Sequence, residues 1–338
     1  MSPMMRPSEA MNCCALLAPF IGFAYAWYIL FSLPIVDLGY ESYRASQFNH
    51  PVGYYNFSDI RYAAPPLADL RFRPPVPPIE NRAFLQEERP SRICPQDVAT
   101  WQPSTAQWIL QKPASGTAPD TWSVPNQFGT IQKGLLETED CLFLDVFAPK
   151  NVFERRKGII RGETEDAPVI VWIHGGGYTT GSKILFGEPT SILKRSQIKD
   201  PSYDIIFVSI NYRLGALGLV SAPSFKGKEN VTANLGLLDQ RMALQWVQDK
   251  IHLFGGDKSR VTVMGESALG GSITQHATAS ENTNIPLIQQ AVVQSPVWRS
   301  SLPPEFQEQN FQQFHPLANA TNLSTARPTQ PQHTFGTP

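Results

Sequence analysis

The 338-residue chain has few charged residues, and their signs nearly cancel. Charged side chains make up 17% of the sequence, against about 25% in a typical soluble protein. Lys and Arg number 28, Asp and Glu 29, and the formal net charge is −1. The sequence also has no run of basic residues. We therefore expect no nucleic-acid partner, because such a partner requires a basic surface.

Other familiar patterns are missing too. The sequence has no repeat period and no heptad pattern, which argues against repeat architectures. Neither Cys-x-x-Cys nor His-Glu-x-x-His occurs, so no metal and no cofactor is implied. What the chain does have is an apolar share of 42%, enough for a large core. Its 30 prolines exceed the usual share of about 5% and indicate long, stiff loops.

The longest apolar run lies at the N-terminus. Residues 13–33 carry no charge and read CCALLAPFIGFAYAWYILFSL. Such a run after a short charged start is typical of a secretory signal, and Ala24-Tyr-Ala26 offers a small-residue cleavage pattern. The run also approaches the ~20 residues that span a bilayer. Residues 1–33 are therefore predicted to be a signal peptide or an uncleaved signal anchor, and only the anchor would hold the protein at a membrane.

Both interpretations place the rest of the chain outside the cytosol, and the cysteines agree. Cys94 and Cys141 are the two cysteines outside the N-terminal segment, an even number that suits an oxidising compartment. A disulfide between them would add roughly 4 kcal/mol of stability in the chain-entropy model. Four sequons are glycosylation acceptors in that setting. They begin at Asn56, Asn230, Asn319 and Asn322.

From residue 34 onward, strand-like runs alternate with a helical pattern. The runs at residues 169–173, 205–210 and 261–264 are mostly apolar and rich in β-branched residues, as in strands buried on both faces of a parallel sheet. Residues 235–251 carry apolar side chains at helical spacing. This alternation predicts an α/β fold with a mostly parallel sheet and helices on both faces. Two further strands are expected at residues 141–147 and 291–293.

The remaining segments lack such patterns. The turn-rich residues 47–80 are predicted to form an extended surface wrap, and residues 98–134 a loop bounded by the two cysteines. From residue 303 the chain turns polar. We therefore expect one α/β domain over residues 34–302 and a poorly ordered tail over residues 303–338.

The first candidate site is the serine turn, Gly265-Glu-Ser-Ala-Leu-Gly-Gly271. It follows the predicted strand at 261–264 and precedes a helical stretch at 272–280. A serine on a sharp strand-to-helix turn is lifted out of the sheet, where a base can reach its hydroxyl. The N–H groups of the helix N-terminus then face a developing oxyanion. The alternative is a surface serine in a glycine-rich turn, but the strand before and the helix after favour catalysis.

The second candidate site is the glycine loop, His174-Gly-Gly-Gly-Tyr178, directly after the predicted strand at 169–173. Three glycines leave their N–H groups unobstructed and allow positive φ, as a preformed anion cradle requires. The alternative is a flexible turn. No Gly-Lys-Ser/Thr follows, so a P-loop is excluded.

Several sequence motifs match those of a known family and occur in the same order along the chain. They are Asp59-Ile-Arg-Tyr-Ala-Ala-Pro-Pro66, Leu70-Arg-Phe-Arg-Pro-Pro75, Glu139-Asp-Cys-Leu-Phe-Leu-Asp-Val146, Val171-Trp-Ile-His-Gly-Gly-Gly-Tyr178, Asn211-Tyr-Arg-Leu-Gly215, Leu237-Leu-Asp-Gln-Arg-Met-Ala-Leu-Gln-Trp246, Phe254-Gly-Gly-Asp257 and the serine turn. With these stretches the chain resembles the type-B carboxylesterase/lipase family, which includes the cholinesterases and has the α/β-hydrolase fold.

The resemblance implies roles at the candidate site. Ser267 would be the nucleophile that accepts the acyl group, and the oxyanion hole would be formed by the N–H groups of Gly176, Gly177 and Ala268. Glu266 would be a buried acid beside the serine.

The resemblance also implies two structural roles. His174 would be structural rather than catalytic. Cys94 and Cys141 would form the family's first disulfide, whose loop lines the entrance of the active-site gorge.

Position 269 departs from the family pattern. Leu269 stands where Gly-x-Ser-x-Gly has its second glycine, and a leucine there would overpack the turn at a cost of roughly 1–3 kcal/mol. We expect Leu269 to impair the turn, and restoring glycine tests this.

The catalytic base is the larger departure. In this fold the acid and the histidine follow the serine in the chain. The histidines after Ser267 are His276, His315 and His333. His276 lies nine residues along the following helix, about 13 Å away, and the other two lie in the polar tail. The family's acid and histidine motifs lie beyond the end of this chain, so the fold is expected to be incomplete on its C-terminal side.

These observations predict a secreted carboxylic ester hydrolase that acts on small-molecule or lipid esters through an acyl-enzyme on Ser267. Activity of this 338-residue chain is in doubt, because a serine without a base is a poor nucleophile. A non-catalytic cholinesterase-like module for binding or adhesion is the alternative. A truncated product without a stable fold is a third hypothesis.

Overall fold

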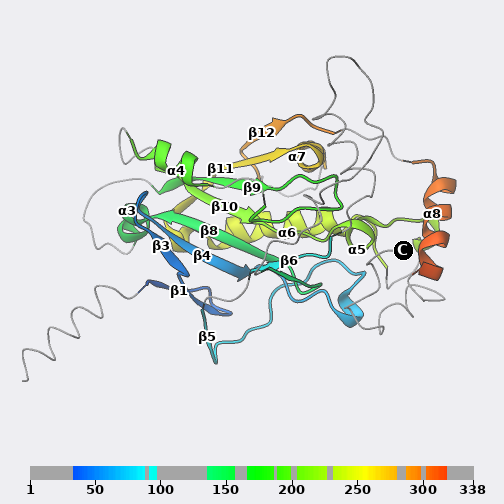
Figure 1. Cartoon of the computed structure of the whole chain (residues 1–338), viewed down its shortest axis with the longest axis horizontal. Helices are drawn as coiled ribbons and strands as arrows, with labels where there is room; N and C mark the ends of the chain where they lie inside the picture. Colours follow the sequence, from blue (N-terminus) through cyan, green and yellow to red (C-terminus); the bar gives the residue numbers. More distant parts are fainter. Residues whose placement is uncertain are drawn as a thin grey trace, which may run out of the picture.

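The computed structural model in Figure 1 describes residues 33–87, 91–96, 135–156, 166–185, 189–198, 204–226, 231–279, 287–297 and 302–317. The predicted targeting segment, the loop at 98–134, and the sequons at Asn230, Asn319 and Asn322 lie outside these residues. So does His333. Among the helices of the described residues, none is both long enough and apolar enough to cross a bilayer.

The centre of the fold is a seven-stranded sheet with the order β12-β11-β9-β10-β8-β4-β3. Its strands are β3 (Gln47–Asn49), β4 (Tyr54–Arg61), β8 (Phe143–Pro149), β9 (Ala167–Ile173), β10 (Ile206–Ile210), β11 (Gly256–Glu266) and β12 (Gln290–Gln294). Strands β12, β11, β9 and β10 pair in parallel, whereas β8, β4 and β3 add on as antiparallel strands. The predicted α/β class is confirmed, but only the half of the sheet that carries the candidate site is parallel.

The central strands are buried on both faces, as their mostly apolar runs predict. In β9, Val169, Val171 and Ile173 face a core that includes α6 (Leu235–Lys250). Between them, Trp172 points to the opposite face, where it packs in a smaller cluster with Leu193 of α4 (Thr190–Ser196). Helices therefore cover both faces of the sheet.

Smaller elements surround this sheet. They are a sheet of β1 (Ile35–Asp37), β2 (Ser42–Arg44) and β5 (Leu85–Gln86), a pair of β6 (Arg92–Ile93) and β7 (Leu136–Glu137), the helices α3 (Lys150–Arg155), α5 (Gly215–Leu219), α7 (Ala268–Thr278) and α8 (Pro304–Leu317), and the short 3₁₀ turns η1 (Ala68–Leu70), η3 (Pro223–Phe225) and η4 (Ile251–Phe254).

Two segments differ from the sequence prediction. The predicted surface wrap contains β4, in the body of the sheet, and its Phe57 and Ile60 are fully buried. The predicted tail is ordered over α8. There Phe311 is 2% exposed and meets Phe225 edge to face, with the ring centroids 4.8 Å apart. In both places buried aromatic or aliphatic side chains hold a segment that also contains many polar or proline residues.

The sequon at Asn56 is also corrected by the structure. Asn56 lies in β4 between β3 and β8, its side chain is only 8% exposed, and Oδ1 is buried. A glycan needs a side chain that projects into solvent, so the prediction of glycosylation at Asn56 is wrong.

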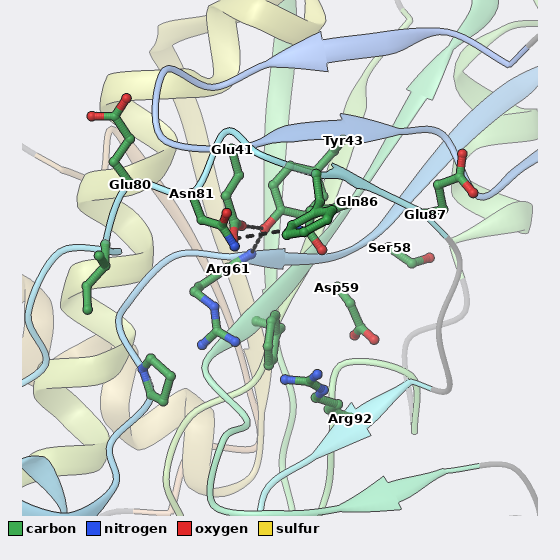
Figure 2. Close-up of a pocket in the computed structure, with 14 residues that line it drawn as sticks. Glu41, Tyr43, Ser58, Asp59, Arg61, Glu80, Asn81, Gln86, Glu87 and Arg92 are labelled. Carbon is green, nitrogen blue, oxygen red and sulfur yellow. Dashed lines mark hydrogen bonds between the residues drawn. The ribbon is translucent and has the colours of Figure 1, made fainter.

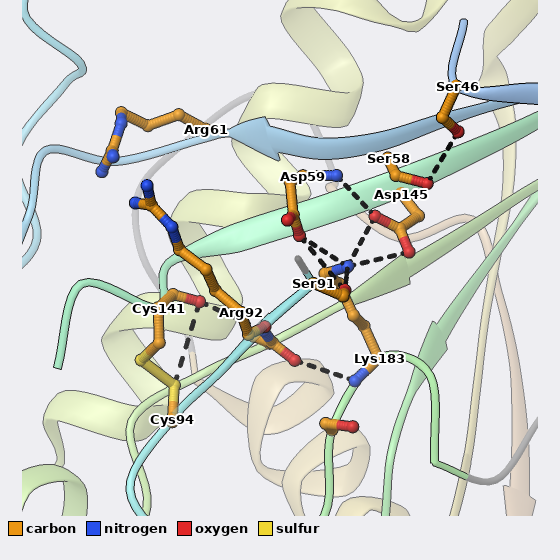
Figure 3. Close-up of polar contacts among 12 residues, drawn as sticks. Ser46, Ser58, Asp59, Arg61, Ser91, Arg92, Cys94, Cys141, Asp145 and Lys183 are labelled. Atoms are coloured by element: carbon orange, nitrogen blue, oxygen red, sulfur yellow. Dashed lines mark hydrogen bonds and ion pairs between the residues drawn. A yellow bond between two sulfur atoms is a disulfide. The ribbon is translucent and has the colours of Figure 1, made fainter. Parts of the chain in front are cut away.

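The predicted disulfide between Cys94 and Cys141 is confirmed, and it lies beside a buried ionic cluster (Figure 3). The Lys183 ammonium is fully buried between Asp145 of β8, at 2.7 Å, and Asp59 of β4, at 2.8 Å. Burial alone would lower the pKa of Lys183, but attraction to the two carboxylates outweighs it and raises the pKa. No sequence motif indicates this cluster, because its three charged residues lie far apart in the chain.

Candidate active site

The serine turn joins the end of β11 to the start of α7. Ser267 has φ 61° and ψ −121°, a backbone conformation that costs a non-glycine residue about 1–3 kcal/mol. Its N–H donates to the Gln294 carbonyl at 3.0 Å, and its carbonyl accepts from the Val297 N–H at 3.0 Å. The segment that leaves β12 therefore holds the strained serine from both sides.

Small residues let α7 pack closely on that segment. A Cβ added to Gly270 would lie 2.9 Å from Pro296 Cα, and one added to Gly271 would lie 2.4 Å from the Val297 carbonyl oxygen. Leu269 between Ala268 and these glycines is fully buried. It is accommodated opposite Gly265, where an added Cβ would lie 2.9 Å from the Leu269 Cβ. The turn forms with leucine in place, and impairment by Leu269 stays a prediction.

The glycine loop turns sharply after β9. Gly176 and Gly177 have φ of 117° and 65°, where glycine is favoured. The N–H groups of Thr179 and Thr180 both donate to the Gly176 carbonyl, at 3.1 and 3.0 Å. A Cβ added to Gly176 would lie 2.1 Å from the Thr180 carbonyl oxygen, so no larger residue fits this turn.

The two loops lie side by side, because β9 and β11 are neighbouring parallel strands whose carboxyl ends meet at one edge of the sheet. A Cβ added to Gly175 would lie 3.5 Å from the Ser267 Cβ. Tyr178 ties the loops together: its hydroxyl donates to the Ala268 carbonyl at 2.6 Å and lies 3.0 Å from the Ser272 hydroxyl. This role of Tyr178 was not predicted from the sequence. Its position as the aromatic residue directly after the three glycines is the feature that could have indicated it.

Ala268 is the first residue of α7. The first N–H groups of a helix have no acceptor within the helix. The Ala268 N–H therefore lies at the helix end, next in the chain to Ser267, and its role as an oxyanion donor stays a prediction.

His174 belongs to the scaffold of the glycine loop. It is fully buried, its Nδ1 lies 2.9 Å from the Gly175 carbonyl oxygen, and its ring stacks on Tyr212 at 4.6 Å. Burial lowers its pKa to about 4, so the ring is neutral. These contacts match the structural role that the resemblance implies, and none of them reaches the Ser267 hydroxyl.

The described part of the chain brings no other histidine to the serine. His276 lies on α7 and its Nε2 is 2.9 Å from the Gln240 side-chain oxygen of α6. Burial, together with the charge of Arg241, lowers the pKa of His276 to about 4. His315 lies in α8, and its side chain falls outside the described residues.

Glu266 departs from its predicted environment. Its side chain is exposed, not buried beside the serine. Its side chain is exposed because Glu266 pairs with Gln294 of β12, the strand at the edge of the sheet. All five residues of β12 are exposed, and within the described ranges no element covers that edge.

Two cavities, each of about 510 Å³, flank the sheet. One lies beside the glycine loop, with Gly177, Tyr178, Leu219 and Phe311 in its wall.

The other cavity is shown in Figure 2 and is lined by Arg61 and Arg92. Both guanidinium groups lie over the Phe143 ring and pair with Asp140. Asp140 therefore offsets only one of their two positive charges, and the wall of this cavity also carries the carboxylates of Glu41, Asp59, Glu80 and Glu87. Among the described residues, no cluster of three or more His, Cys, Asp or Glu side chains is arranged to hold a metal.

A strained serine at a strand-to-helix turn, facing a glycine loop on the neighbouring parallel strand, defines the α/β-hydrolase fold. Comparison with known proteins goes one step further. The sequence profile of the Carboxylesterase family matches residues 42–333. The chain belongs to the carboxylesterase family.

The relatives and solved structures agree with this assignment. The chain is 39% identical over 307 residues to Carboxylesterase patB of Penicillium expansum, covering 87% of this chain and 54% of that protein. It is 42% identical over 158 residues to a secreted lipase of Arthroderma benhamiae, covering 47% and 30%. The crystal structure of Aspergillus niger EstA matches with a TM-score of 0.64 and 28% identity, covering 88% and 50%. The chain thus spans about half the length of the Penicillium expansum carboxylesterase and of the Aspergillus niger esterase structure.

Proposed function

We propose that this protein is a carboxylic ester hydrolase that works through an acyl-enzyme on Ser267. The observation that carries the proposal is the contact between the serine turn and the glycine loop, where an added Gly175 Cβ would lie 3.5 Å from the Ser267 Cβ. A nucleophilic hydroxyl beside unobstructed backbone N–H groups is the arrangement that acyl transfer requires.

The reaction has two steps. The Ser267 hydroxyl oxygen attacks the ester carbonyl carbon, and the carbonyl oxygen becomes an oxyanion that accepts hydrogen bonds from the N–H groups of Gly176, Gly177 and Ala268. The alcohol leaves with a proton, and the acyl group stays on the serine. Water then attacks the acyl-enzyme, releases the carboxylic acid and returns the proton to the serine.

The proton that leaves Ser267 needs a base, and the described residues bring none to it. The oxyanion donors alone support only residual catalysis. The proposed activity of the chain therefore depends on an acid and a histidine outside these residues.

The proposed substrates are small-molecule or lipid esters. The cavity beside the glycine loop has Gly177 in its wall together with the apolar side chains of Leu219 and Phe311. It can receive an apolar substituent of an ester whose oxygen reaches the loop. A relative described as a secreted lipase supports ester substrates and export, with residues 1–33 as the signal and Asn230, Asn319 and Asn322 as glycosylation sites. The alternative, a non-catalytic module, gains no support from the esterases and lipases found as relatives.

A fluorophosphonate probe tests the proposal, because it bonds covalently to a nucleophilic serine. The described residues supply oxyanion donors but no base, so we expect slow labelling of the folded chain. Labelling should be lost completely in Ser267→Ala and retained in Ser259→Ala, which removes an exposed hydroxyl from β11. Absence of labelling on folded protein, or equal labelling of Ser267→Ala, overturns the proposal.

A further inference from the structure

Gln96 links the disulfide to the segment that leaves the glycine loop. Its side-chain oxygen accepts from the Gly181 N–H at 2.7 Å, and its side-chain nitrogen donates to the Gly181 carbonyl at 3.0 Å. The same nitrogen donates to the Cys94 carbonyl at 2.6 Å. One amide group thus pairs with both backbone groups of Gly181, as a neighbouring strand would.

Gly181 in turn packs against the start of the glycine loop. It has φ +110°, and a Cβ added to it would lie 2.3 Å from His174 Nδ1 and 2.5 Å from the Gly175 carbonyl oxygen. The backbone at Gly181 therefore fixes the position of His174 and Gly175. These residues lead directly into the glycines whose N–H groups are the proposed oxyanion donors.

The other end of this linkage is anchored in the core. Cys94 is bonded to Cys141, and both are buried. The Gln96 N–H donates to a Glu137 side-chain oxygen at 2.9 Å. The Asn211 side chain donates to the Cys141 carbonyl at 3.2 Å. Gln96 is thus held by a covalent bridge two residues away and by one hydrogen bond of its own backbone.

We propose that Gln96 is a positioning residue for the oxyanion donors and that the Cys94–Cys141 disulfide acts on the glycine loop through it. This inference rests on the proposed function for its catalytic consequence, but the geometry of the loop can be measured without catalysis. Removing the side-chain amide of Gln96 leaves Gly181 without its partner, and removing the disulfide leaves Gln96 without its covalent anchor. In either case the loop in front of Gly181 gains freedom.

Hydrogen exchange measured by mass spectrometry tests the linkage. In Gln96→Ala we expect exchange in residues 174–181 to accelerate about tenfold, the effect of losing a few side-chain hydrogen bonds. Exchange in β10 should stay unchanged. Gln96→Glu keeps an acceptor for the Gly181 N–H but loses both donated bonds, so it should fall in between. Gln245→Ala, an exposed glutamine of α6, is the control and should change neither segment.

The double variant Cys94→Ala/Cys141→Ala tests whether the disulfide acts through Gln96. It should accelerate loop exchange by a similar factor, and adding Gln96→Ala to it should change exchange less than about twofold, because the two sites are coupled. If Gln96 and the disulfide only stabilised the fold independently, their effects on the exchange rate would multiply in the triple variant. The faster exchange would then also spread to β10. Either result, or unchanged loop exchange in Gln96→Ala, overturns the inference.

The rate of fluorophosphonate labelling separates the inference from the proposed function. We expect slower labelling of Ser267 in Gln96→Ala in proportion to the faster loop exchange. Labelling that proceeds at the wild-type rate in Gln96→Ala contradicts a positioning role while leaving the hydrolase intact. No labelling of any variant, with loop exchange still responding to Gln96, overturns the hydrolase and leaves the linkage standing.

Discussion

Strands β8 and β12 belong to one sheet, but their environments are opposite. All seven residues of β8 are buried, between β10 and β4. All five residues of β12 are exposed, and among the described elements only β11 pairs with it. Val292 and Val293 point to opposite faces of the sheet, yet they are 41% and 38% exposed. A strand with apolar side chains on both faces has the composition of an interior strand, so β12 has the sequence of an interior strand in the position of an edge strand.

The serine turn lies at the border between these two regions. The neighbouring glycine loop follows β9, on the side of the buried strand β8. The backbone of Ser267 is hydrogen-bonded to Gln294 and Val297, on the side of the exposed strand β12. The difference teaches that the glycine loop with Gly176 and Gly177 follows a strand paired to strands β10 and β11, whereas the turn with Ser267 and Ala268 follows a strand that lies next to the exposed edge strand.

The largest expected effect is on the buried side. Lys183→Met leaves the buried Asp145 and the partly buried Asp59 without their cation, and we expect the free energy of unfolding to fall by about 3–5 kcal/mol. The matched control is Lys194→Met, an exposed lysine of α4, which should change it by less than about 0.5 kcal/mol. Urea unfolding measures both. Equal effects of the two variants would show that the polar cluster does not stabilise the β8 region.

Lowering the pH should reduce the free energy of unfolding through two histidines that lie near the serine turn and the glycine loop. Burial holds the pKa values of His174 and His276 at about 4, below the ordinary 6.5, so between these values the unfolded chain binds more protons than the folded one. Stability is then full above about pH 6.5 and falls as the pH drops toward 4, by roughly 2 kcal/mol per histidine between pH 7 and pH 5. Urea unfolding at the two pH values checks this. His276→Gln should reduce the pH dependence by about half of the histidine contribution, and an unchanged slope would contradict it.

The smallest effect compares two valines directly. Val146→Ala in β8 removes a fully buried side chain and should cost about 1–2 kcal/mol. Val292→Ala in β12 removes a side chain that is 41% exposed and should cost less than about 0.5 kcal/mol. A cost for Val292→Ala as large as that for Val146→Ala would mean that the edge is covered in solution. Thermal unfolding of both variants at several protein concentrations distinguishes a covering second copy from a covering segment of the same chain.

The sequence predicted the parallel half of the fold well. Strands β9, β10 and the second half of β11 are mostly apolar runs of strand length, and their length and β-branched residues favour buried strands over helices. Strand β4 was not predicted, because Ser58 and Asp59 interrupt its apolar pattern. Asp59 is partly buried where it pairs with Lys183, a partner more than a hundred residues away. Helix α8 was not predicted from the sequence, because its described side chains include only one buried aromatic residue, Phe311.

Some features of the candidate site were also predictable from the sequence, and others were not. The meeting of the serine turn and the glycine loop follows from the carboxyl ends of adjacent parallel strands, which the motifs locate. The exposure of Glu266 does not follow, because it depends on what lies beyond β12. The contacts of Tyr178 and Gln96 also depend on tertiary packing, and neither residue type indicates its partner in advance.

The backbone at position 267 has a consequence for how such a chain changes over generations. Glycine is the residue that adopts φ 61° and ψ −121° at the least cost. A chain released from the need for a nucleophile would therefore gain stability by replacing this serine with glycine. In this site the hydroxyl and the thermodynamic optimum are in conflict, and the sequence has kept the hydroxyl.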